Sequence, residues 1–340
     1  MPLPSAFQRY RQELEDTLRS ILAEGEPALL YRMMRYHLGW EDAAGKPTTA
    51  NGGKGLRPTV ALLACECVGG DWRKALPAAA AIELVHNFSL VHDDIQDQDR
   101  ERRHRPTVWA LWGAAQGINV GDGLLTLAHL AAYRLLDQGI APVTVVRVAR
   151  TIDQRTMEMV EGQSMDLSFE EDVIGLDSYL DMIARKTGAL FDCSLEVGAL
   201  IGSEDTAIAE AFGRCGRLLG LAFQVRDDML GVWGSESETG KPAGADIRRR
   251  KKSLPIVYAL SLQSSQRERL LSIYSRPEIT ESDVAFVLDA LDKLGASEYC
   301  QSMAAAKKRE ALVQLEHAGL NPEAYRELEE VADFVLERRF

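Results

Sequence analysis

The chain has 340 residues, with 39 Lys and Arg against 51 Asp and Glu, and a formal net charge of −12. This acidic balance disfavours a nucleic-acid or membrane-surface binder, because both partners attract positively charged surfaces. With 46% hydrophobic and 26% charged residues, the composition is that of an ordinary globular protein. No stretch approaches the roughly 18 apolar residues of a membrane span, and the first residues lack the apolar core of a secretory signal. We therefore expect a cytoplasmic protein without integral membrane association.

The cysteines agree with this location. There are five, at positions 65, 67, 193, 215 and 300. The number is odd, and no pair has the Cys-x-x-Cys spacing of a common metal or redox site. We expect reduced thiols that pack as small hydrophobic side chains.

Helical periodicity dominates the chain. Four long segments carry apolar residues three and four positions apart: residues 6–25, 74–94, 143–163 and 209–230. Alternating β-branched runs are nearly absent, so we expect no sheet. Three polar segments with Gly or Pro read as loops, each too short to link domains: residues 41–55, 168–178 and 234–246. The sequence predicts one all-α domain, residues 1–340, of on the order of ten or more helices.

The run from His86 to Asp97 ends in a cluster of aspartates. On a helix, Asp93 and Asp97 lie one turn apart, with Asp94 beside them and His86 two turns below. Three carboxylates on one stripe repel each other unless a cation lies among them, and oxygen ligands without thiols favour Mg²⁺ over zinc. A solvated acidic helix face is the alternative.

A second cluster favours the metal interpretation. An apolar helical run ends in Gln224, Arg226, Asp227 and Asp228. A run this apolar enters a core, so the aspartate pair is expected to face a cavity. Two facing aspartate clusters can hold several Mg²⁺ ions against a polyphosphate, because each ion takes one or two carboxylates and completes its shell with water and phosphate.

Basic residues complement these carboxylates. Lys54 and Arg57 lie in a glycine-rich turn that enters a helix, which suits phosphate binding although the Walker spacing is missing. Arg102 and Arg103 follow the first cluster, and Lys241 follows the second. A basic run at 248–252 could be a solvated face, but in an acidic chain it makes better sense as a diphosphate clamp.

In order, the chain carries GGKGLRP, LVHDDIQD with QDRERRHRPT behind it, KTG, FQVRDD and TGKPAGADIRRRKKSLP. This collinear set, from about residue 50 to 260, resembles the trans-isoprenyl diphosphate synthases, and within them the geranylgeranyl diphosphate synthases. The resemblance implies an all-α bundle around a deep apolar cavity of the isoprenoid synthase type, a homodimer, and Mg²⁺, three ions per active site. Its substrates would be isopentenyl diphosphate and an allylic diphosphate such as the dimethylallyl, geranyl or farnesyl compound.

The resemblance also assigns roles to residues. The two aspartate motifs match Asp93, Asp94 and Asp97, then Asp227 and Asp228, with Asp93, Asp97 and Asp227 as metal ligands. The site for isopentenyl diphosphate matches Lys54, Arg57, His86 and Arg103. The clamp on the allylic diphosphate matches Arg102, Lys186, Lys241 and Lys251. Polar groups beside the reacting carbon match Thr187 and Gln224.

Two positions depart from the family pattern. Gly231 stands where many members have a final aspartate of the second motif, which weakens the case for a third carboxylate there. His104 stands where the arginine pair is commonly followed by Gly. This change could alter the loop and the fit of the diphosphate, although both arginines remain.

Product length is expected to depend on the side chains below the first motif. Ser89 lies one turn below Asp93, Phe88 is next to it around the helix, and Val85 is about two turns below. A small Ser lets the growing chain pass, while Phe88 narrows the pocket. A single aromatic residue five places before the motif resembles C20 synthases, so we predict geranylgeranyl diphosphate. The alternative is that Phe88 is an ordinary core residue.

Other residues have simpler interpretations. His92 is interpreted as a helix-surface or core residue. Gln163 and Asp166 could orient waters or Lys186, or they could cap a helix end.

Two alternative functions stay open. A terpene cyclase on the same scaffold would not need Lys54, Arg57 and Arg103. A non-catalytic regulatory subunit of a heteromeric prenyl synthase would be expected to lose one aspartate cluster, whereas both are present here.

Overall fold

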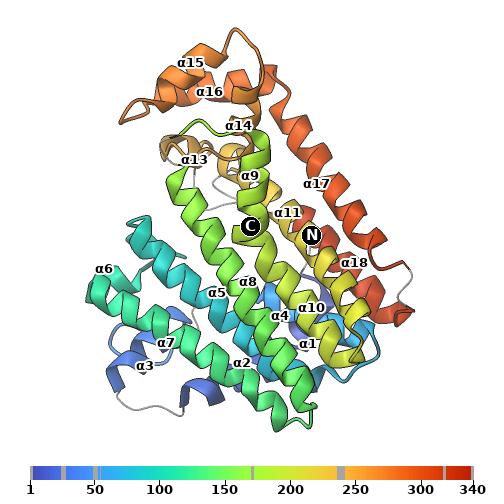
Figure 1. The fold of residues 1–340 in the computed structure, drawn as a ribbon. Helices are drawn as coiled ribbons and strands as arrows, with labels where there is room; N and C mark the ends of the chain where they lie inside the picture. The colour runs from blue at the N-terminus through green and yellow to red at the C-terminus, as the bar shows by residue number, and fades with distance from the viewer. Residues whose placement is uncertain are drawn as a thin grey trace.

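The computed structural model describes residues 3–23, 28–48, 53, 55–169, 172–235, 242–316 and 319–337. Helices dominate these residues (Figure 1). In chain order they are α1 (Ser5–Arg9), α2 (Arg11–Ala23), α3 (Ala28–His37), α4 (Leu56–Cys67), η1 (Trp72–Ala75), α5 (Leu76–Gln96), α6 (Val108–Trp112), α7 (Ala114–Tyr133), η2 (Arg134–Leu136), α8 (Pro142–Ser168), α9 (Leu176–Ile183), η3 (Ala184–Gly188), α10 (Ala189–Ser203), α11 (Thr206–Trp233), α13 (Ala245–Arg248), α14 (Leu254–Ser261), α15 (Arg267–Tyr274), α16 (Glu281–Lys293), α17 (Ala296–Val313) and α18 (Pro322–Glu337). The predicted all-α class is confirmed.

One hairpin departs from the expectation of no sheet. Strands β1 (Glu101–Arg102) and β2 (Arg105–Pro106) pair antiparallel. The two residues between them, Arg103 and His104, have positive φ angles of 52° and 59°. Positive φ at both central positions matches the twist of paired strands, and His adopts this region more readily than most residues. Strands of two residues have no alternating pattern that a sequence could display.

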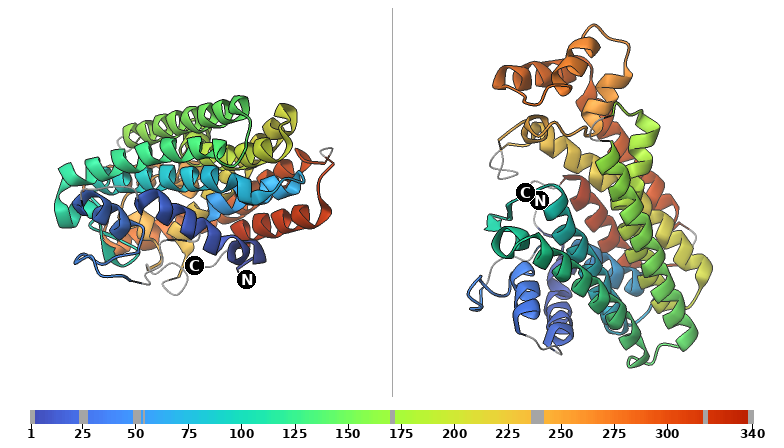
Figure 2. Two further views of the ribbon diagram at one scale, coloured as in Figure 1. Left: turned by 90° about the horizontal axis from the view of Figure 1, so that it is seen from below. Right: turned by 60° about the vertical axis from the view of Figure 1, so that its left-hand side comes forward.

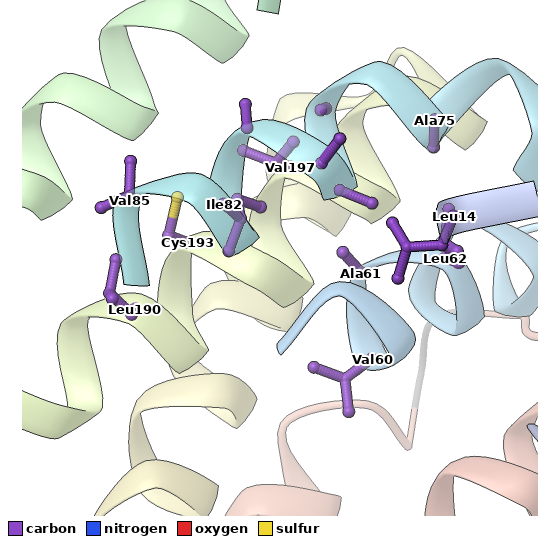
Figure 3. Close-up of a cluster of buried hydrophobic side chains, with 14 of the residues drawn as sticks. Leu14, Val60, Ala61, Leu62, Ala75, Ile82, Val85, Leu190, Cys193 and Val197 are labelled. Carbon is purple, nitrogen blue, oxygen red and sulfur yellow. The ribbon is translucent and has the colours of Figure 1, made fainter. Parts of the chain in front are cut away.

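Helices α5 and α10 carry the centre of the core. In Figure 3, Ile82 and Val85 of α5 lie beside Leu190, Cys193 and Val197 of α10. All five cysteines are buried and unbridged, as predicted.

A glycine lets α10 approach α4 closely. A Cβ on Gly198 would stand 1.9 Å from the carbonyl oxygen of Ala61, so the two backbones are in direct contact. Around this centre, α7 and α8 form an outer layer on one side (Figure 2). Helices α15 and α16 pack with α14 in a second apolar cluster at the top of Figure 1. Among the helices that the structure describes, none is both long and apolar enough to cross a bilayer.

Candidate active site

Three aspartates lie at the C-terminal end of α5, and Asp94 differs from Asp93 and Asp97 in its contacts. Asp94 is only 2% exposed, and the Arg102 Nε donates to its Oδ1 at 2.7 Å. Asp93 and Asp97 have no side-chain hydrogen bond within the described parts of the chain. Burial raises the pKa of Asp93 to about 6; the charge of Lys186 opposes this rise and that of Asp97 adds to it. A cation beside Asp93 and Asp97 would relieve their mutual repulsion.

Lys186 and Thr187 lie on η3, a π-helical turn. Such turns interrupt the regular helix and frequently occur at functional sites. Lys186 Nζ lies 2.5 Å from Asp166 Oδ2 on α8. A Cβ on Gly162 would stand 2.2 Å from the Lys186 amide nitrogen, so only glycine allows α8 to pass this close to the turn. The structure supports the interpretation in which Asp166 orients Lys186.

The two aspartates of the second motif differ in burial. Asp228 is fully buried and accepts hydrogen bonds from the Tyr179 hydroxyl, from Gln224 Nε2 at 3.0 Å and from the Leu254 amide at 3.0 Å. Burial raises its pKa to about 6 although these donors oppose the rise. Asp227 is only partly buried. Asp228 therefore holds neighbouring groups in place, and Asp227 is the more exposed carboxylate of the pair.

Gln224 connects Asp228 to the π turn. Its Oε1 accepts a hydrogen bond from the Thr187 hydroxyl at 2.7 Å, while its Nε2 donates to Asp228. The structure thus connects the predicted pair Thr187 and Gln224 to Asp228 of the second aspartate motif. Because both ends of the amide are bonded, its orientation is fixed.

Lys251 lies near Asp246, with its Nζ 4.0 Å from Asp246 Oδ2 and its side chain 45% exposed. Burial opposes its ionisation, but carboxylates that include Asp246, Asp228 and Asp227 outweigh burial and raise its pKa. Its charge also lowers the pKa of Asp97 in the first motif, although burial leaves that pKa above its ordinary value. Lys251 therefore links the two clusters electrostatically.

The other cations of the basic run point elsewhere. Arg248 pairs with Glu281 at 2.7 Å and Arg249 pairs with Asp99 at 3.2 Å. Arg250 donates to the Tyr274 carbonyl at 3.0 Å, and Lys252 donates to the carbonyls of Phe169 and Asp172. These contacts hold the basic run against neighbouring segments of the chain. Lys251 instead lies near Asp246.

Asp246 occupies the space beside Gly231. A Cβ on Gly231 would stand 2.1 Å from Asp246 Oδ2 and 2.4 Å from its Cγ. The same Oδ2 lies 4.0 Å from Lys251 Nζ. The carboxylate that the second motif lacks at position 231 is thus replaced, in space, by one from α13.

A separate group of basic side chains lies below the first motif. Arg57 Nη1 lies 3.2 Å from His86 Nε2. Burial, followed by the charges of Arg57 and Arg103, holds the pKa of His86 well below its ordinary value, so the ring is neutral. The guanidinium of Arg103 lies against Gly53, where a Cβ would stand 2.8 Å from its Nη2. The structure thus brings Arg57, His86 and Arg103 together, while Lys54 and Lys241 lie outside the described residues.

The residues expected to set product length are mostly packed. Phe88 is 7% exposed and Val85 is fully buried. Ser89 is partly exposed and donates to the His86 carbonyl at 2.8 Å. Two surface hollows of about 360 and 320 Å³ lie along α11, α17 and α18 and include none of these residues. The deep apolar cavity therefore stays a prediction.

The aspartate cluster consists of Asp93, Asp97, Asp166, Lys186, Asp227 and Lys251. Within the described residues no three acidic, His or Cys side chains converge on one metal position. The donors are carboxylate oxygens from the two aspartate motifs, which suits a hard divalent cation. Such an ion would need further oxygen ligands between the groups, as a diphosphate provides. The donor set therefore fits Mg²⁺ held jointly by the protein and its substrate.

Sequence reasoning missed a second set of charges on the same helices. This arginine network consists of Arg155, Glu158, Asp192, Glu196 and Arg217. Arg217 binds Asp192 and Glu158 at 2.8 and 2.6 Å, and Arg155 binds Asp192 at 3.1 Å. Burial raises the pKa of Asp192 although both guanidinium groups oppose the rise. Tyr179, which fixes Asp228, was also missed, because nothing in its local sequence marks it.

Comparison with known proteins gives a family. A family model described as Polyprenyl synthetase matches residues 40–291. A (2E,6E)-farnesyl diphosphate synthase of Mycobacterium tuberculosis is 38% identical over 328 residues, which cover 95% of this chain and 90% of that protein. A geranylgeranyl diphosphate synthase of the same organism is 38% identical over 307 residues, or 90% and 86% of the two chains. The crystal structure of a polyprenyl synthetase from Streptomyces coelicolor superposes with a TM-score of 0.91 at 35% identity, over 98% of this chain and 99% of that one.

Proposed function

The chain belongs to the polyprenyl synthetase family and is a chain-elongating prenyltransferase, and from that premise we propose that its main product is geranylgeranyl diphosphate. The substrates would be isopentenyl diphosphate and a dimethylallyl, geranyl or farnesyl diphosphate. The observation that carries the proposed mechanism is the aspartate cluster, in which Asp93 and Asp97 lie at the end of α5 and Lys186 Nζ lies 2.5 Å from Asp166 Oδ2.

Asp93, Asp97 and Asp227 would hold Mg²⁺, with three ions in the site. When bound, the ions neutralise the charge that develops on the departing pyrophosphate. Asp94 and Asp228 would orient neighbouring side chains and would not bind the ions directly, since Arg102 and Tyr179 already bind them. Asp246 would take the place of the third carboxylate of the second motif, because it fills the space above Gly231.

Lys186, Lys251 and Arg102 would bind the allylic diphosphate, together with Lys241. As the carbon–oxygen bond breaks, its electron pair leaves with pyrophosphate, and these cations stabilise the charge that forms. Thr187 and Gln224 would lie beside the resulting allylic cation. Their mutual hydrogen bond keeps these dipoles fixed, so they need not reorganise during the reaction.

Arg57, His86 and Arg103, with Lys54, would hold the diphosphate of isopentenyl diphosphate. Fixing this second substrate near the cation replaces a bimolecular encounter by an intramolecular one. The double bond attacks the cation, a carbon–carbon bond forms, and a proton leaves to a pyrophosphate oxygen. The protein supplies no covalent nucleophile in this scheme.

The C20 product rests on the residues below Asp93. In this proposal, the small Ser89 lets a growing chain pass, and the bulky Phe88, next to it around α5, narrows the pocket from one side. The relatives include both farnesyl and geranylgeranyl synthases, so the family alone does not choose between C15 and C20.

A product assay tests the proposal. With Mg²⁺ and isopentenyl diphosphate, each of the three primers should yield mainly C20 by mass spectrometry, and Asp93→Ala should abolish it. A dominant C15 or C25 product would overturn the chain-length argument and keep the mechanism. Hydrocarbon released without isopentenyl diphosphate would indicate a cyclase, and no turnover with any primer would indicate a regulatory subunit.

We further propose one domain and a homodimer. The main core cluster includes residues from Ala6 near one end to Phe334 near the other. Outward-facing apolar residues on α8, Val143, Val146, Met157 and Val160, are between 41% and 64% exposed and share one face. Met157→Glu should shift the chain from dimer to monomer in light scattering. Dimers that survive this change would place the interface elsewhere.

A further inference from the structure

His92 lies between the first aspartate motif and the neighbouring helix α7. Its ring lies on the backbone of Gly121, where a Cβ would stand 2.1 Å from Nε2 and 2.3 Å from Cδ2. Nε2 also lies 3.3 Å from the Ile118 carbonyl and 3.8 Å from Asp122 Oδ1. The ring therefore fills a notch in α7 that only glycine leaves open.

The His92 ring also contacts the ring of Phe88. The two residues are four positions apart on α5 and share one face. Their ring centroids are 5.1 Å apart with an interplanar angle of 77°, the edge-on arrangement that aromatic rings prefer. Because α7 blocks His92 from moving away, His92 in turn limits where the Phe88 ring can go.

We propose that His92 is a positioning residue for product length: it fills the notch at Gly121 and so keeps Phe88 across the path of the growing chain. This inference rests on the proposed role of Phe88. Without the His92 ring, the notch becomes free space beside Phe88. Buried aromatic rings move into such space because a cavity costs contacts. The Phe88 ring then leaves the path, and elongation continues past C20.

The test compares products from farnesyl diphosphate with excess isopentenyl diphosphate. His92→Ala should raise the ratio of products longer than C20 to C20 by roughly fivefold or more, which corresponds to about 1 kcal/mol. The KM for isopentenyl diphosphate should stay unchanged, because Arg57, His86 and Arg103 are not touched. His129→Ala on α7, which removes an exposed ring paired with Asp153 at 3.1 Å, is the matched control and should keep the native product.

Two further variants separate the possible outcomes. Phe88→Ala should lengthen the product by itself, and His92→Ala should add nothing in that background. If Phe88→Ala lengthens the product and His92→Ala does not, the inference about His92 is wrong and the proposed role of Phe88 stands. If neither does, the role of Phe88 falls as well. Should His92→Ala fail to fold, His92→Gln removes the ring while keeping a polar end near Ile118, and a native product ratio in it would equally overturn the inference.

Discussion

The aspartate cluster and the arginine network share helices α8 and α11 and differ in how fully their carboxylates are paired. Helix α8 carries Asp166 in the first and Glu158 in the second, and α11 carries Asp227 and Arg217 in the same relation. In the network, every carboxylate meets an arginine within 3.3 Å: Asp192 and Glu158 each meet both arginines, and Glu196 meets Arg155. In the cluster, Asp93 and Asp97 have no such partner among the described residues, and burial raises the pKa of both.

This difference indicates what each set does. A network whose charges are satisfied locks three helices together and gains nothing from a ligand. Under the proposed function, a cation and a diphosphate would compensate the like charges of Asp93 and Asp97 in the cluster. Helices α8 and α11 thus carry a paired set of charges and, under the proposed function, a set that the substrate would complete, about two to three turns apart.

Neutralising the cluster should give the largest effect on catalysis. Asp93→Asn removes a proposed metal ligand, so kcat/KM should fall by about 10³-fold, as for other losses of charge stabilisation in a transition state. The melting temperature should stay the same or rise, because a buried and poorly compensated charge is gone. Steady-state kinetics and calorimetry on one preparation measure both.

Asp122→Asn is the matched control for that change. Asp122 is an exposed carboxylate on α7, and its loss should change neither quantity. A large loss of stability in Asp93→Asn would show that the cluster is structural and that the comparison with the network is wrong.

Breaking the network should do the reverse. Arg217→Met leaves Asp192 and Glu158 short of a partner, which should lower the free energy of unfolding by about 3 kcal/mol, at the low end for a buried pair because the arginine keeps 27% exposure. Activity per folded molecule should persist. Urea unfolding followed by circular dichroism measures the change.

Arg185→Met provides the contrast for the network variant. Arg185 pairs with Asp181 and Glu161 on the surface, and such pairs contribute less than about 1 kcal/mol. If both variants lost the same free energy of unfolding, burial would not make the network more stabilising than a surface ion pair.

The pH dependence of stability should expose the buried carboxylate of the second motif. The pKa of Asp228 is raised to about 6 in the folded chain, against an ordinary value of 3.8. The folded state therefore binds the proton more tightly than the unfolded state does. The contribution of this proton binding to stability is fully present below about pH 4 and is lost as the pH rises to about 6. At 1.36 kcal/mol per pKa unit, the loss is about 3 kcal/mol.

Asp228→Asn isolates this contribution, because other titrating groups cancel in the difference between the two proteins. Without Mg²⁺ or diphosphate, the stability of the native protein relative to Asp228→Asn should fall between pH 4 and pH 6. A difference that stays flat or rises across this range would mean that Asp228 ionises at least as easily in the folded chain as in the unfolded one.

Sequence reasoning predicted the cluster better than the network, for physical reasons. Asp93 and Asp97, or Gln224 and Asp228, are neighbours on one helix, so their spacing already places them together. The network joins Arg155, Asp192 and Arg217 from three helices, and each alone reads as part of a solvated face. Only the packing of α8, α10 and α11 brings them into contact.

The same distinction holds for smaller features. The all-α class follows from helical periodicity, but the hairpin at Arg103 and His104 depends on backbone angles that no pattern displays. Gly231 was interpreted as a missing carboxylate. The fold shows that Asp246, 15 positions later, lies in the space that a side chain at 231 would need.

The substitution Gly231→Ala has the smallest expected effect and tests the role of Asp246 selectively. Gly231→Ala favours the helix by up to about 1 kcal/mol, but its Cβ meets Asp246 Oδ2 at 2.1 Å and must push the carboxylate aside. Stability should change little, because the two effects oppose each other. Lys251, held near Asp246, should shift with it and lower kcat/KM for the allylic substrate by about tenfold.

Gly175→Ala serves as the control for Gly231→Ala, since a Cβ at Gly175 meets nothing within 4 Å and its φ is −80°. It should leave both kinetics and stability unchanged. If Gly231→Ala instead lost stability while keeping native kinetics, the contact between Asp246 and α11 would belong with the arginine network as a structural device. A fall in kcat/KM with unchanged stability would place Asp246 in the aspartate cluster. Helix α13 would then supply one carboxylate of that cluster.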